Sequence, residues 1–276
     1  MTTPRKILDR HDLRPLKRYG QSFLVDRDIM ARIVDSAAIG PHDHVVEIGA
    51  GVGILTGMLA DRAGRVTALE VDRRMIAVLE EEMAGRENVM ILNEDVLSYD
   101  FSSAATSGDR VRVVGNIPYN ISSQILLHLI RRREHLSTAT LMLQKEFAER
   151  ILAAPGTSDY GSLSVLTAVY MIPTRVIAVP SNCFFPSPKV SSLVIRLETR
   201  DRPLVTVNNP DHFENVVRAS FAKRRKTLLN SLKDNPFLTI DRKQALPALA
   251  ESGIDPDRRG ETLTPQEFCR LADSLG

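Results

Sequence analysis

From Asp26 to Glu198 the sequence alternates between short runs rich in β-branched residues and longer amphipathic stretches. This alternation is typical of α/β proteins, in which each strand is followed by a helix that packs against a sheet. Because 43% of the 276 residues are hydrophobic, the chain can bury a sizeable core. We expect strands over 44–48, 65–71, 88–92, 110–115 and 138–144, followed by a pair of strands over 175–180 and 190–198.

The pattern changes after Glu198. Residues 199–210 (TRDRPLVTVNNP) have the composition of a linker, and the remainder of the chain has helical periodicity. We therefore expect two domains, a doubly wound α/β domain over 1–200 and a small helical domain over 201–276. Helices of the second domain are expected to begin near Asp211, Asp241 and Thr264.

Composition disfavours several classes of protein. The chain has no run of about 18 apolar residues, and its charged N-terminus lacks the apolar centre of a signal peptide. We therefore expect a soluble, cytoplasmic protein with no membrane partner. Cys183 and Cys269 form no CxxC pair, and the six histidines show no HExxH arrangement, so we expect no metal site and no disulfide framework.

A glycine-rich loop follows the first expected strand. The sequence GAGVG contains Gly49, Gly51 and Gly53 and comes directly before a helical stretch. Glycines at such a point let the backbone approach a nucleoside or dinucleotide, and we expect Gly49 and Gly51 to contact a cofactor. A nicotinamide-binding loop would have another glycine where this chain has Ile54, so a nicotinamide oxidoreductase is disfavoured.

Two acidic residues follow the next two strands. Glu70 stands at the end of the second strand, where its carboxylate can accept both ribose hydroxyls, and Asp95 follows the third, where it can accept from an adenine amine. S-adenosylmethionine has no phosphate and carries a positive sulfonium, so an acidic wall suits it better than it suits NAD. The alternative is that both acids only stand at helix N-termini, where the helix dipole favours them.

The fourth strand ends in NIPY, residues 116–119, which should lie beside the glycine loop because strands one and four of such a sheet are neighbours. The exocyclic amine of adenine is a poor nucleophile, since its lone pair is delocalised into the ring. The Asn116 side-chain oxygen and the carbonyl of Ile117 or Pro118 can accept its two N–H groups, which orients the lone pair and stabilises the developing positive charge. Tyr119 offers a face on which an extruded base can stack. The alternative is an ordinary turn after a strand.

Basic residues are concentrated in 215–233, which contains six Lys/Arg and no acid, although the net charge of the whole chain is only +2. Within it Lys223, Arg224, Arg225 and Lys226 are expected on consecutive positions of a helix, around which they would fan. Two or three of them could neutralise RNA phosphates. The alternative is a solvated helix start.

Eight segments in order, covering nearly the whole chain, resemble one family. This is the family of ribosomal RNA adenine N6,N6-dimethyltransferases, in particular the small-subunit enzyme linked to kasugamycin sensitivity. The segments are KRYGQSFLVD (17–26), VEIGAGVGILT (46–56), ALEVD (68–72), EDVL (94–97), NIPY (116–119), YGSLSVL (160–166), FFPSPKVSS (184–192) and FAKRRKTLLNSL (221–232).

The resemblance implies a Rossmann-like class I methyltransferase domain followed by a small helical domain that helps to hold RNA. It implies transfer of two methyl groups from S-adenosylmethionine to N6 of each of two adjacent adenosines near the 3′ end of small-subunit (16S) rRNA. The substrate would be a ribosomal precursor particle, and we expect the enzyme to be a monomer.

The resemblance also assigns residues. It places the target adenine between Tyr119 and Phe184. Where the family usually has Asn or His at the methionine end of the cofactor, this chain has Ser22, whose side chain can still hydrogen-bond with a shorter reach. Cofactor contacts carried over position by position fall on Ser22, Leu24, Gly49, Glu70, Asp95 and Asn116.

Two other functions are kept as alternatives. The related large-subunit adenine methyltransferase of antibiotic resistance has the same chemistry, but GQSFL instead of SQNFL and the full RRKTLLNSL segment favour the small-subunit enzyme. A ribosome-assembly factor that binds RNA and whose catalysis is dispensable would keep the fold. The presence of Glu70, Asp95 and NIPY argues against loss of activity.

Overall fold

The computed structural model describes residues 3–105, 109–223 and 225–276, which form two compact units. The first unit contains the described residues up to Ala148 together with Thr174–Thr199, and the second contains Glu149–Pro173 and the described residues from Arg200 onward. The expected domain boundary at residue 200 leaves Glu149–Pro173 in the first domain, whereas its contacts group it with the C-terminal helices. The reason is that α8 (Ser162–Tyr170) packs on α9 (Pro210–Ser220).

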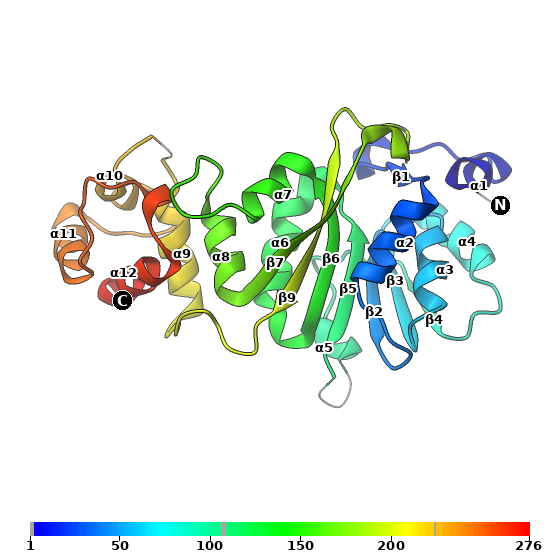
Figure 1. Cartoon of the computed structure of the whole chain (residues 1–276), viewed down its shortest axis with the longest axis horizontal. Coiled ribbons are helices and arrows are strands. Elements are labelled where there is room, and N and C mark those ends of the chain that lie inside the picture. The colour runs from blue at the N-terminus through cyan, green and yellow to red at the C-terminus, as the bar shows by residue number, and fades with distance from the viewer. Residues whose placement is uncertain (1–2, 106–108, 224) are drawn as a thin grey trace. The chain divides into compact units, whose positions relative to one another are not determined.

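A seven-stranded sheet forms the centre of the first unit, with the strand order β4-β3-β2-β5-β6-β9-β7 (Figure 1). The strands β4, β3, β2, β5 and β6 are parallel, and β9 runs antiparallel to β6. This order confirms the predicted doubly wound α/β fold and the predicted pairing of the last two strands. The strands are β2 (His44–Ile48), β3 (Arg65–Leu69), β4 (Val89–Leu92), β5 (Val111–Asn116), β6 (Leu136–Gln144), β7 (Met171–Val179) and β9 (Ser192–Thr199).

The strand register brings three chain segments to one edge of the sheet. Ile48 at the end of β2 is paired with Leu69 of β3 on one side and with Gly115 of β5 on the other. The residues that follow these three strands therefore lie at the same carboxyl edge, at the point where the strand order reverses. Ligands of open α/β sheets bind at this point.

Several helices of the first unit begin at capping side chains that the sequence supplies. Asp26 Oδ1 accepts the backbone N–H groups of Asp28 and Ile29, each at 3.1 Å, which starts α2 as predicted. None of the helices that the structure describes has the length and apolar content needed to cross a bilayer. The unit also has a two-stranded sheet, β1 (Phe23–Leu24) with β8 (Phe184–Phe185), and the helices α1 (Pro4–Arg10), α2 (Arg27–Ser36), α3 (Ile54–Ala60), α4 (Arg73–Glu82), α5 (Phe101–Ala104), α6 (Ser122–Arg131) and the first part of α7 (Lys145–Ile151).

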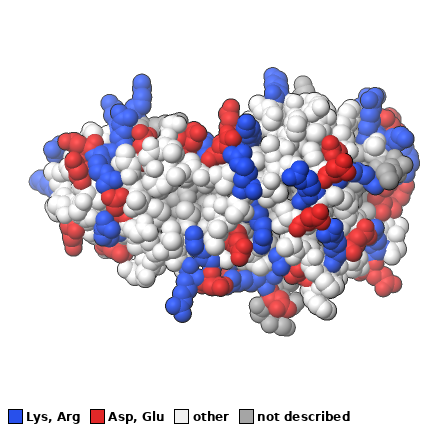
Figure 2. All heavy atoms as spheres, viewed as in Figure 1, with Lys and Arg blue, Asp and Glu red and all other residues white. Residues whose placement is uncertain are grey.

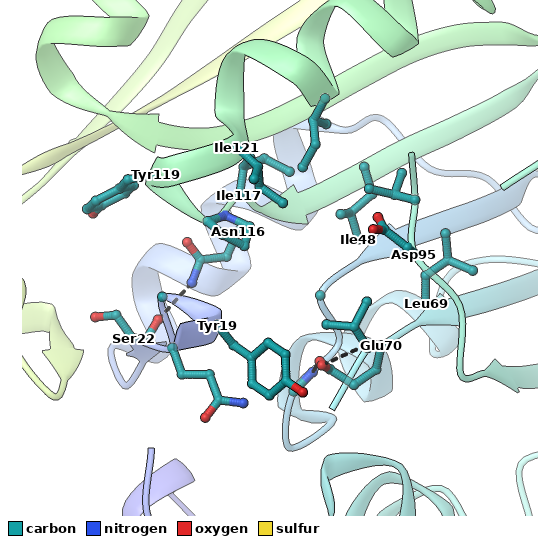
Figure 3. A pocket seen from close by; sticks show the side chains of 18 of the residues that line it. Tyr19, Ser22, Ile48, Leu69, Glu70, Asp95, Asn116, Ile117, Tyr119 and Ile121 are labelled. Carbon is teal, nitrogen blue, oxygen red and sulfur yellow. Dashed lines mark hydrogen bonds between the residues drawn. The ribbon is translucent and has the colours of Figure 1, made fainter. Parts of the chain in front are cut away.

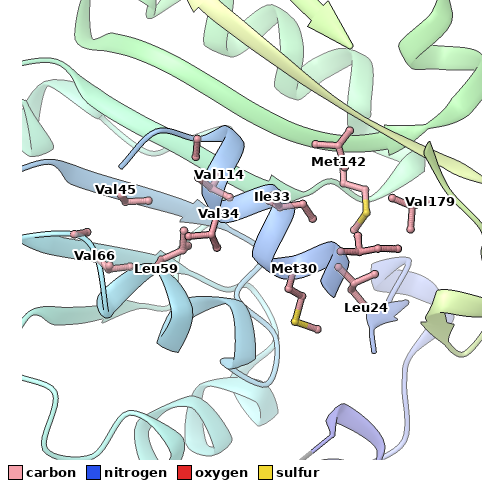
Figure 4. Close-up of a cluster of buried hydrophobic side chains, with 14 of the residues drawn as sticks. Leu24, Met30, Ile33, Val34, Val45, Leu59, Val66, Val114, Met142 and Val179 are labelled. Atoms are coloured by element: carbon pink, nitrogen blue, oxygen red, sulfur yellow. The ribbon is translucent and has the colours of Figure 1, made fainter. Parts of the chain in front are cut away.

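The core of this unit forms where α2 and α3 cover one face of the sheet (Figure 4). Ile33 and Val34 of α2 and Leu59 of α3 are no more than 3% exposed. They pack in one cluster with Val45 and Val114 of the sheet. Each such side chain stabilises the fold by roughly 1.5–3 kcal/mol through burial, and together they fix the strand ends that carry the site.

The second unit is a small group of helices, as predicted for the C-terminal region. Its helix starts agree with the predicted ones to within a residue, because Asn209, Asp241 and Thr264 each cap a helix through a side-chain oxygen. Phe213 of α9 and Phe268 of α12 are almost fully buried. Besides α8 and α9, the helices are α10 (Leu228–Leu232), α11 (Arg242–Glu251) and α12 (Pro265–Leu275).

Gly53, the N-cap of α3, provides a test of this packing. Its φ is +82°, and a Cβ at this position would lie 2.7 Å from Leu79 Cδ1. Gly85 has the same φ of +82°, but a Cβ there would have no neighbour within 4 Å. Gly85→Ala should therefore cost only the left-handed backbone strain, about 1–2 kcal/mol, whereas Gly53→Ala should cost about 1–3 kcal/mol more through overpacking. Urea unfolding followed by circular dichroism measures both, and equal losses would contradict the packing described for Gly53.

Candidate functional site

A pocket opens at the carboxyl edge of the sheet, where β2, β3 and β5 end (Figure 3). Its free volume, open solvent included, is about 810 Å³, which lies in the range of small-molecule pockets. The lining residues are Tyr19, Gly20, Gln21, Ser22, Phe23, Ile48, Gly49, Gly51, Leu69, Glu70, Val71, Glu94, Asp95, Val96, Asn116, Ile117, Pro118, Tyr119, Ile121 and Ile125.

The glycine loop after β2 forms one wall. The backbone N–H groups of Gly49 and Ala50 donate to the Leu69 carbonyl at 2.9 and 3.2 Å, which ties the loop to the end of β3. Gly51 has a φ of +57°, and a Cβ there would lie 2.9 Å from Phe23 Cε1. A side chain at position 51 would therefore clash with the Phe23 ring and strain the left-handed backbone.

Glu70 forms the wall next to this loop, and its carboxylate is almost fully hydrogen-bonded to backbone. Oε2 accepts the Gly51 N–H at 2.9 Å, and Oε1 accepts the N–H groups of Val71 and Asp72 at 3.0 and 2.9 Å. Burial raises the pKa of Glu70 above its ordinary value, while these three N–H groups oppose the rise. The carboxylate thus joins the glycine loop to the turn after β3.

Asp95 lies in the pocket wall after β4, where the sequence predicted it (Figure 3). Its Oδ1 accepts the Leu97 N–H at 3.0 Å. The ends of β3 and β4 are held together because Asn93 Nδ2 donates to the Glu70 carbonyl at 2.8 Å. Glu70 and Asp95 therefore face the same cavity from neighbouring strands.

Asn116 ends β5 on the other side of the glycine loop. Its Nδ2 donates to the Ser22 carbonyl at 2.9 Å, as the dashed line in Figure 3 shows. With the amide nitrogen bound in this way, the side-chain oxygen is the end of the amide that is presented to a ligand. The Pro118 carbonyl already accepts from the Ser122 hydroxyl at 3.0 Å, so the Ile117 carbonyl is the better second acceptor.

Tyr119 lies at the edge of the pocket, away from Glu70 (Figure 3). Its hydroxyl is hydrogen-bonded to Ser192 Oγ at 2.7 Å. Phe184, the other predicted stacking residue, is not among the lining residues. Its side chain is 3% exposed and packs in the core with Leu24. The structure therefore places Tyr119 at the pocket and does not bring Phe184 to it.

The two other predicted cofactor residues flank Phe23: Ser22 precedes β1 and Leu24 ends it. The Ser22 hydroxyl donates to the Pro186 carbonyl at 2.7 Å, and Ser22 lines the pocket. Leu24 is 8% exposed and lines a neighbouring pocket that shares Gly49, Gly51 and Asn116 with the first.

Glu47 lies beneath the glycine loop and was not singled out from the sequence. Its carboxyl is buried, accepts the Thr56 hydroxyl at 2.6 Å and lines the neighbouring pocket. Burial raises the pKa of Glu47 to about 7. The sequence around Glu47 predicts only that it lies in a strand. It does not indicate that its carboxyl lines a pocket.

Further lining residues were not singled out from the sequence, among them Tyr19, Gln21, Phe23 and Val71. Val71 is 42% exposed although it is apolar, so the pocket offers a flat apolar surface beside Glu70. Tyr19, Gln21 and Phe23 lie in a segment whose sequence resembles the family, but only its Ser22 and Leu24 had been assigned a role.

The basic cluster differs from the prediction. Arg224 lies outside the described residues. The described residues of 221–227 form turns between α9 and α10, so the predicted consecutive helical positions are wrong. After these turns, the Leu228 N–H at the start of α10 donates to the Arg258 carbonyl at 2.6 Å.

The remaining basic side chains differ in their surroundings. Lys223 is paired with Asp234, and this pairing lowers the pKa of the Asp234 carboxyl. Arg225 and Lys226 are exposed. Lys and Arg are mixed with Asp and Glu over the face that Figure 2 shows.

One group of possible metal ligands occurs in the part of the chain that the structure describes. His11, Glu81 and Glu82 offer ligand atoms within 4.8 Å of one another. Both glutamates form ion pairs with Arg10. None of the three residues lines the pocket.

Comparison with known proteins identifies the family. The family model described as ribosomal RNA adenine dimethylase matches residues 13–276. Proteins called ribosomal RNA small subunit methyltransferase A are similar over their full length. The one from Moorella thermoacetica is 46% identical and covers 95% of this chain and 92% of its own. The one from Syntrophus aciditrophicus is 41% identical and covers 100% and 99%.

Solved structures agree with this comparison. A dimethyladenosine transferase from Plasmodium falciparum has a TM-score of 0.76 and 30% identity, covering 90% of this chain and 95% of its own. The 23S rRNA methyltransferase ErmE has a TM-score of 0.67 and 32% identity, covering 92% and 99%. The helical C-terminal region and the class I methyltransferase sheet are thus common to these proteins. The chain belongs to the ribosomal RNA adenine dimethylase family.

Proposed function

We propose that this chain transfers methyl groups from S-adenosylmethionine to the N6 amine of adenine in small-subunit ribosomal RNA, giving N6,N6-dimethyladenosine. The observation that carries the proposal is the position of Asn116. Its amide shares one pocket with the acids Glu70 and Asp95, and its nitrogen is held by the Ser22 carbonyl. An acceptor oxygen for an amine thus lies beside a cavity with an acidic wall.

The pocket fits S-adenosylmethionine chemically. Among the described residues, Glu70 Oε2 accepts only the Gly51 N–H and so can still accept a ribose hydroxyl, and Asp95 is an acceptor for the adenine amine of the donor. The exposed Val71 offers an apolar surface for the adenine plane. We assign Ser22 and Leu24, next to the glycine loop, to the methionine end. When bound, S-adenosylmethionine supplies a methyl group on a positively charged sulfur.

Catalysis by this chain is then a matter of orientation and charge. Asn116 Oδ1 and the Ile117 carbonyl accept the two N6 hydrogens of the target adenine, which draws the nitrogen lone pair out of conjugation with the ring and directs it toward the methyl group. Once N6 carries the methyl group, it releases one of its hydrogens as a proton to solvent. The same two oxygens stabilise the positive charge that develops on N6. Tyr119 stacks on the base, and its hydrogen bond to Ser192 fixes the ring for this purpose. A second methyl transfer needs only one acceptor, because one N–H remains.

The finer assignments follow from the family. We infer that the targets are two adjacent adenosines near the 3′ end of small-subunit rRNA, within a precursor particle, and that the enzyme acts as a monomer in the cytoplasm. The helical C-terminal unit would bind RNA, with Arg225 and Lys226 as its exposed cations. The likeness to ErmE makes large-subunit rRNA the alternative substrate.

The proposal is tested with purified protein, S-adenosylmethionine and ribosomal particles. Small-subunit and large-subunit particles lacking the modification are incubated separately, and their RNA is digested to nucleosides for mass spectrometry. N6,N6-dimethyladenosine should form in the small-subunit RNA only. Formation in the large-subunit RNA would assign the resistance-type activity, and no product in either would refute the proposed chemistry.

Replacing Glu70 by Ala should weaken the binding of S-adenosylmethionine. The ribose loses a charge-assisted hydrogen bond, and the Gly51 N–H loses its acceptor, so we expect a loss of about 1–3 kcal/mol. Calorimetry of the folded variant measures the affinity. Glu80→Ala, which removes an exposed carboxylate from α4, serves as the control and should bind like the parent. Unchanged affinity in the Glu70 variant would remove this residue from the cofactor site.

Replacing Asn116 by Ala should lower the rate of methyl transfer by about 100-fold or more, because the transition state loses an oriented acceptor. RNA affinity should stay close to that of the parent. Single-turnover assays at saturating substrates measure the rate, and filter binding measures the affinity. A near-normal rate at saturation would show that Asn116 is not catalytic.

Replacing Arg225 and Lys226 together by Ala should weaken RNA binding more at low salt than at high salt. Each lost phosphate contact should flatten the slope of log affinity against log salt by roughly 0.7–0.9. Affinity for S-adenosylmethionine should not change, since neither residue lines the pocket. The control is the double variant of Arg242 and Lys243, two exposed cations of α11. An unchanged slope for Arg225 and Lys226 would place the RNA surface elsewhere.

A further inference from the structure

The segment from Leu13 to Ser22, here called the strap, connects α1 to β1 and borders the pocket through Tyr19, Gln21 and Ser22. Much of it is irregular, so side chains hold it in place. Gln21 is the central one. Its Oε1 accepts the Leu16 N–H at 2.7 Å, and its Nε2 donates to Asp72 Oδ2 at 2.8 Å. Both ends of this one amide are therefore used to fold the strap against the sheet.

Asp72 is a firm anchor for the strap. It is 2% exposed, and its oxygens also accept from the Arg74 backbone N–H at 3.1 Å and from Arg74 Nε and Nη2 at 3.0 and 2.5 Å. Burial by itself would raise the pKa of Asp72, but the hydrogen bonds from Arg74 and Gln21 outweigh it and hold the pKa below its ordinary value. The anchor therefore stays charged at neutral pH.

The anchor is joined directly to the cofactor wall. The Asp72 backbone N–H donates to Glu70 Oε1 at 2.9 Å, and Glu70 Oε2 accepts from Gly51. Because Glu70 and Asp72 are two residues apart in one tight turn, the Gln21 amide is fixed relative to the glycine loop.

The other end of the connection reaches the catalytic amide. The residue after Gln21 is Ser22, whose carbonyl accepts from Asn116 Nδ2 at 2.9 Å. If this carbonyl moved, the Asn116 amide could rotate and present its NH₂ group to the adenine amine, which would set donor against donor. The position of the strap therefore decides whether Asn116 offers its oxygen to the substrate.

We propose that Gln21 is a positioning residue for methyl transfer: by bridging Leu16 and Asp72 it holds the Ser22 carbonyl in the place that orients the Asn116 amide. The proposal rests on the proposed function for Asn116. Gln21 touches neither reacting atom in this role, and its effect passes through Ser22. Its loss therefore lowers the rate at saturating substrates, and it does so only while Asn116 is present.

A double-mutant cycle measures this dependence. Gln21→Met keeps the length of the side chain and removes both hydrogen bonds, and it should lower kcat roughly 10- to 100-fold. When Asn116 is already Ala, adding Gln21→Met should change kcat by less than about twofold. Gln266→Met, at an exposed position of α12, is the matched control and should leave kcat unchanged. If the fold reductions in kcat of the two single variants multiplied in the double variant, the proposal would be overturned. A normal kcat for Gln21→Met would also overturn it.

The conservative variant Gln21→Glu adds a second kinetic readout. The introduced carboxyl can still accept from Leu16 but can donate to Asp72 only when protonated. The charged groups around it are Asp72, Glu70 and Arg74. Two carboxyls at hydrogen-bonding distance share a proton more readily as the pH falls. Relative to the parent, kcat of this variant should therefore recover toward low pH, and a constant ratio across pH would contradict the role of the Gln21–Asp72 bond.

A readout without substrate separates this proposal from the proposed function. In protein labelled with ¹⁵N-asparagine, the side-chain resonance of Asn116 is assigned by its absence in Asn116→Ala. Gln21→Met should shift that resonance while thermal melting shows a folded protein, and Gln266→Met should not. An unshifted resonance would overturn the positioning role whether or not the parent transfers methyl groups. An inactive parent with a shifted resonance would refute the proposed function alone.

Discussion

The buried carboxylate of Glu70 is the interaction on which the geometry of the pocket depends. A carboxylate only accepts hydrogen bonds, and this one accepts from three backbone N–H groups, one in the glycine loop and two in the turn after β3. The loop and the turn are thereby kept at a fixed separation beneath the ligand cavity. This wall of the pocket is thus held in place by hydrogen bonds of the chain itself.

The register of the parallel strands also fixes the position of Asn116 relative to the glycine loop. Since Ile48 is paired with both Leu69 and Gly115, the glycine loop lies between Glu70 and Asn116. The strap provides a second connection between the two sides. Gln21 is hydrogen-bonded to Asp72, close to Glu70, and the carbonyl of the next residue, Ser22, accepts from Asn116. Glu70 and Asn116 are therefore joined by backbone and hydrogen bonds through both the sheet and the strap.

Much of this site could be predicted from the sequence, because it depends on where strands end. Glu70, Asp95 and Asn116 each follow or end a β-branched run, and the caps Asp241 and Thr264 mark helix starts. The features that could not be predicted depend on contacts between distant segments. The basic segment 221–227 was predicted to be helical, but its described residues form turns, and the Leu228 N–H that follows them is bound to the distant Arg258 carbonyl. The packing of α8 on the C-terminal helices and the hydrogen bond from Gln21 to Asp72 are likewise tertiary contacts. No local sequence pattern predicts them.

We propose that this pocket is where adenine of small-subunit ribosomal RNA is dimethylated. The most direct test is nucleoside mass spectrometry of small-subunit rRNA from cells that have the gene, cells that lack it, and cells in which the gene carries Asn116→Ala. The account predicts N6,N6-dimethyladenosine in the first and its loss in the other two, with the variant protein present at the parent's level. An unchanged amount of dimethyladenosine in cells without the gene would contradict the account.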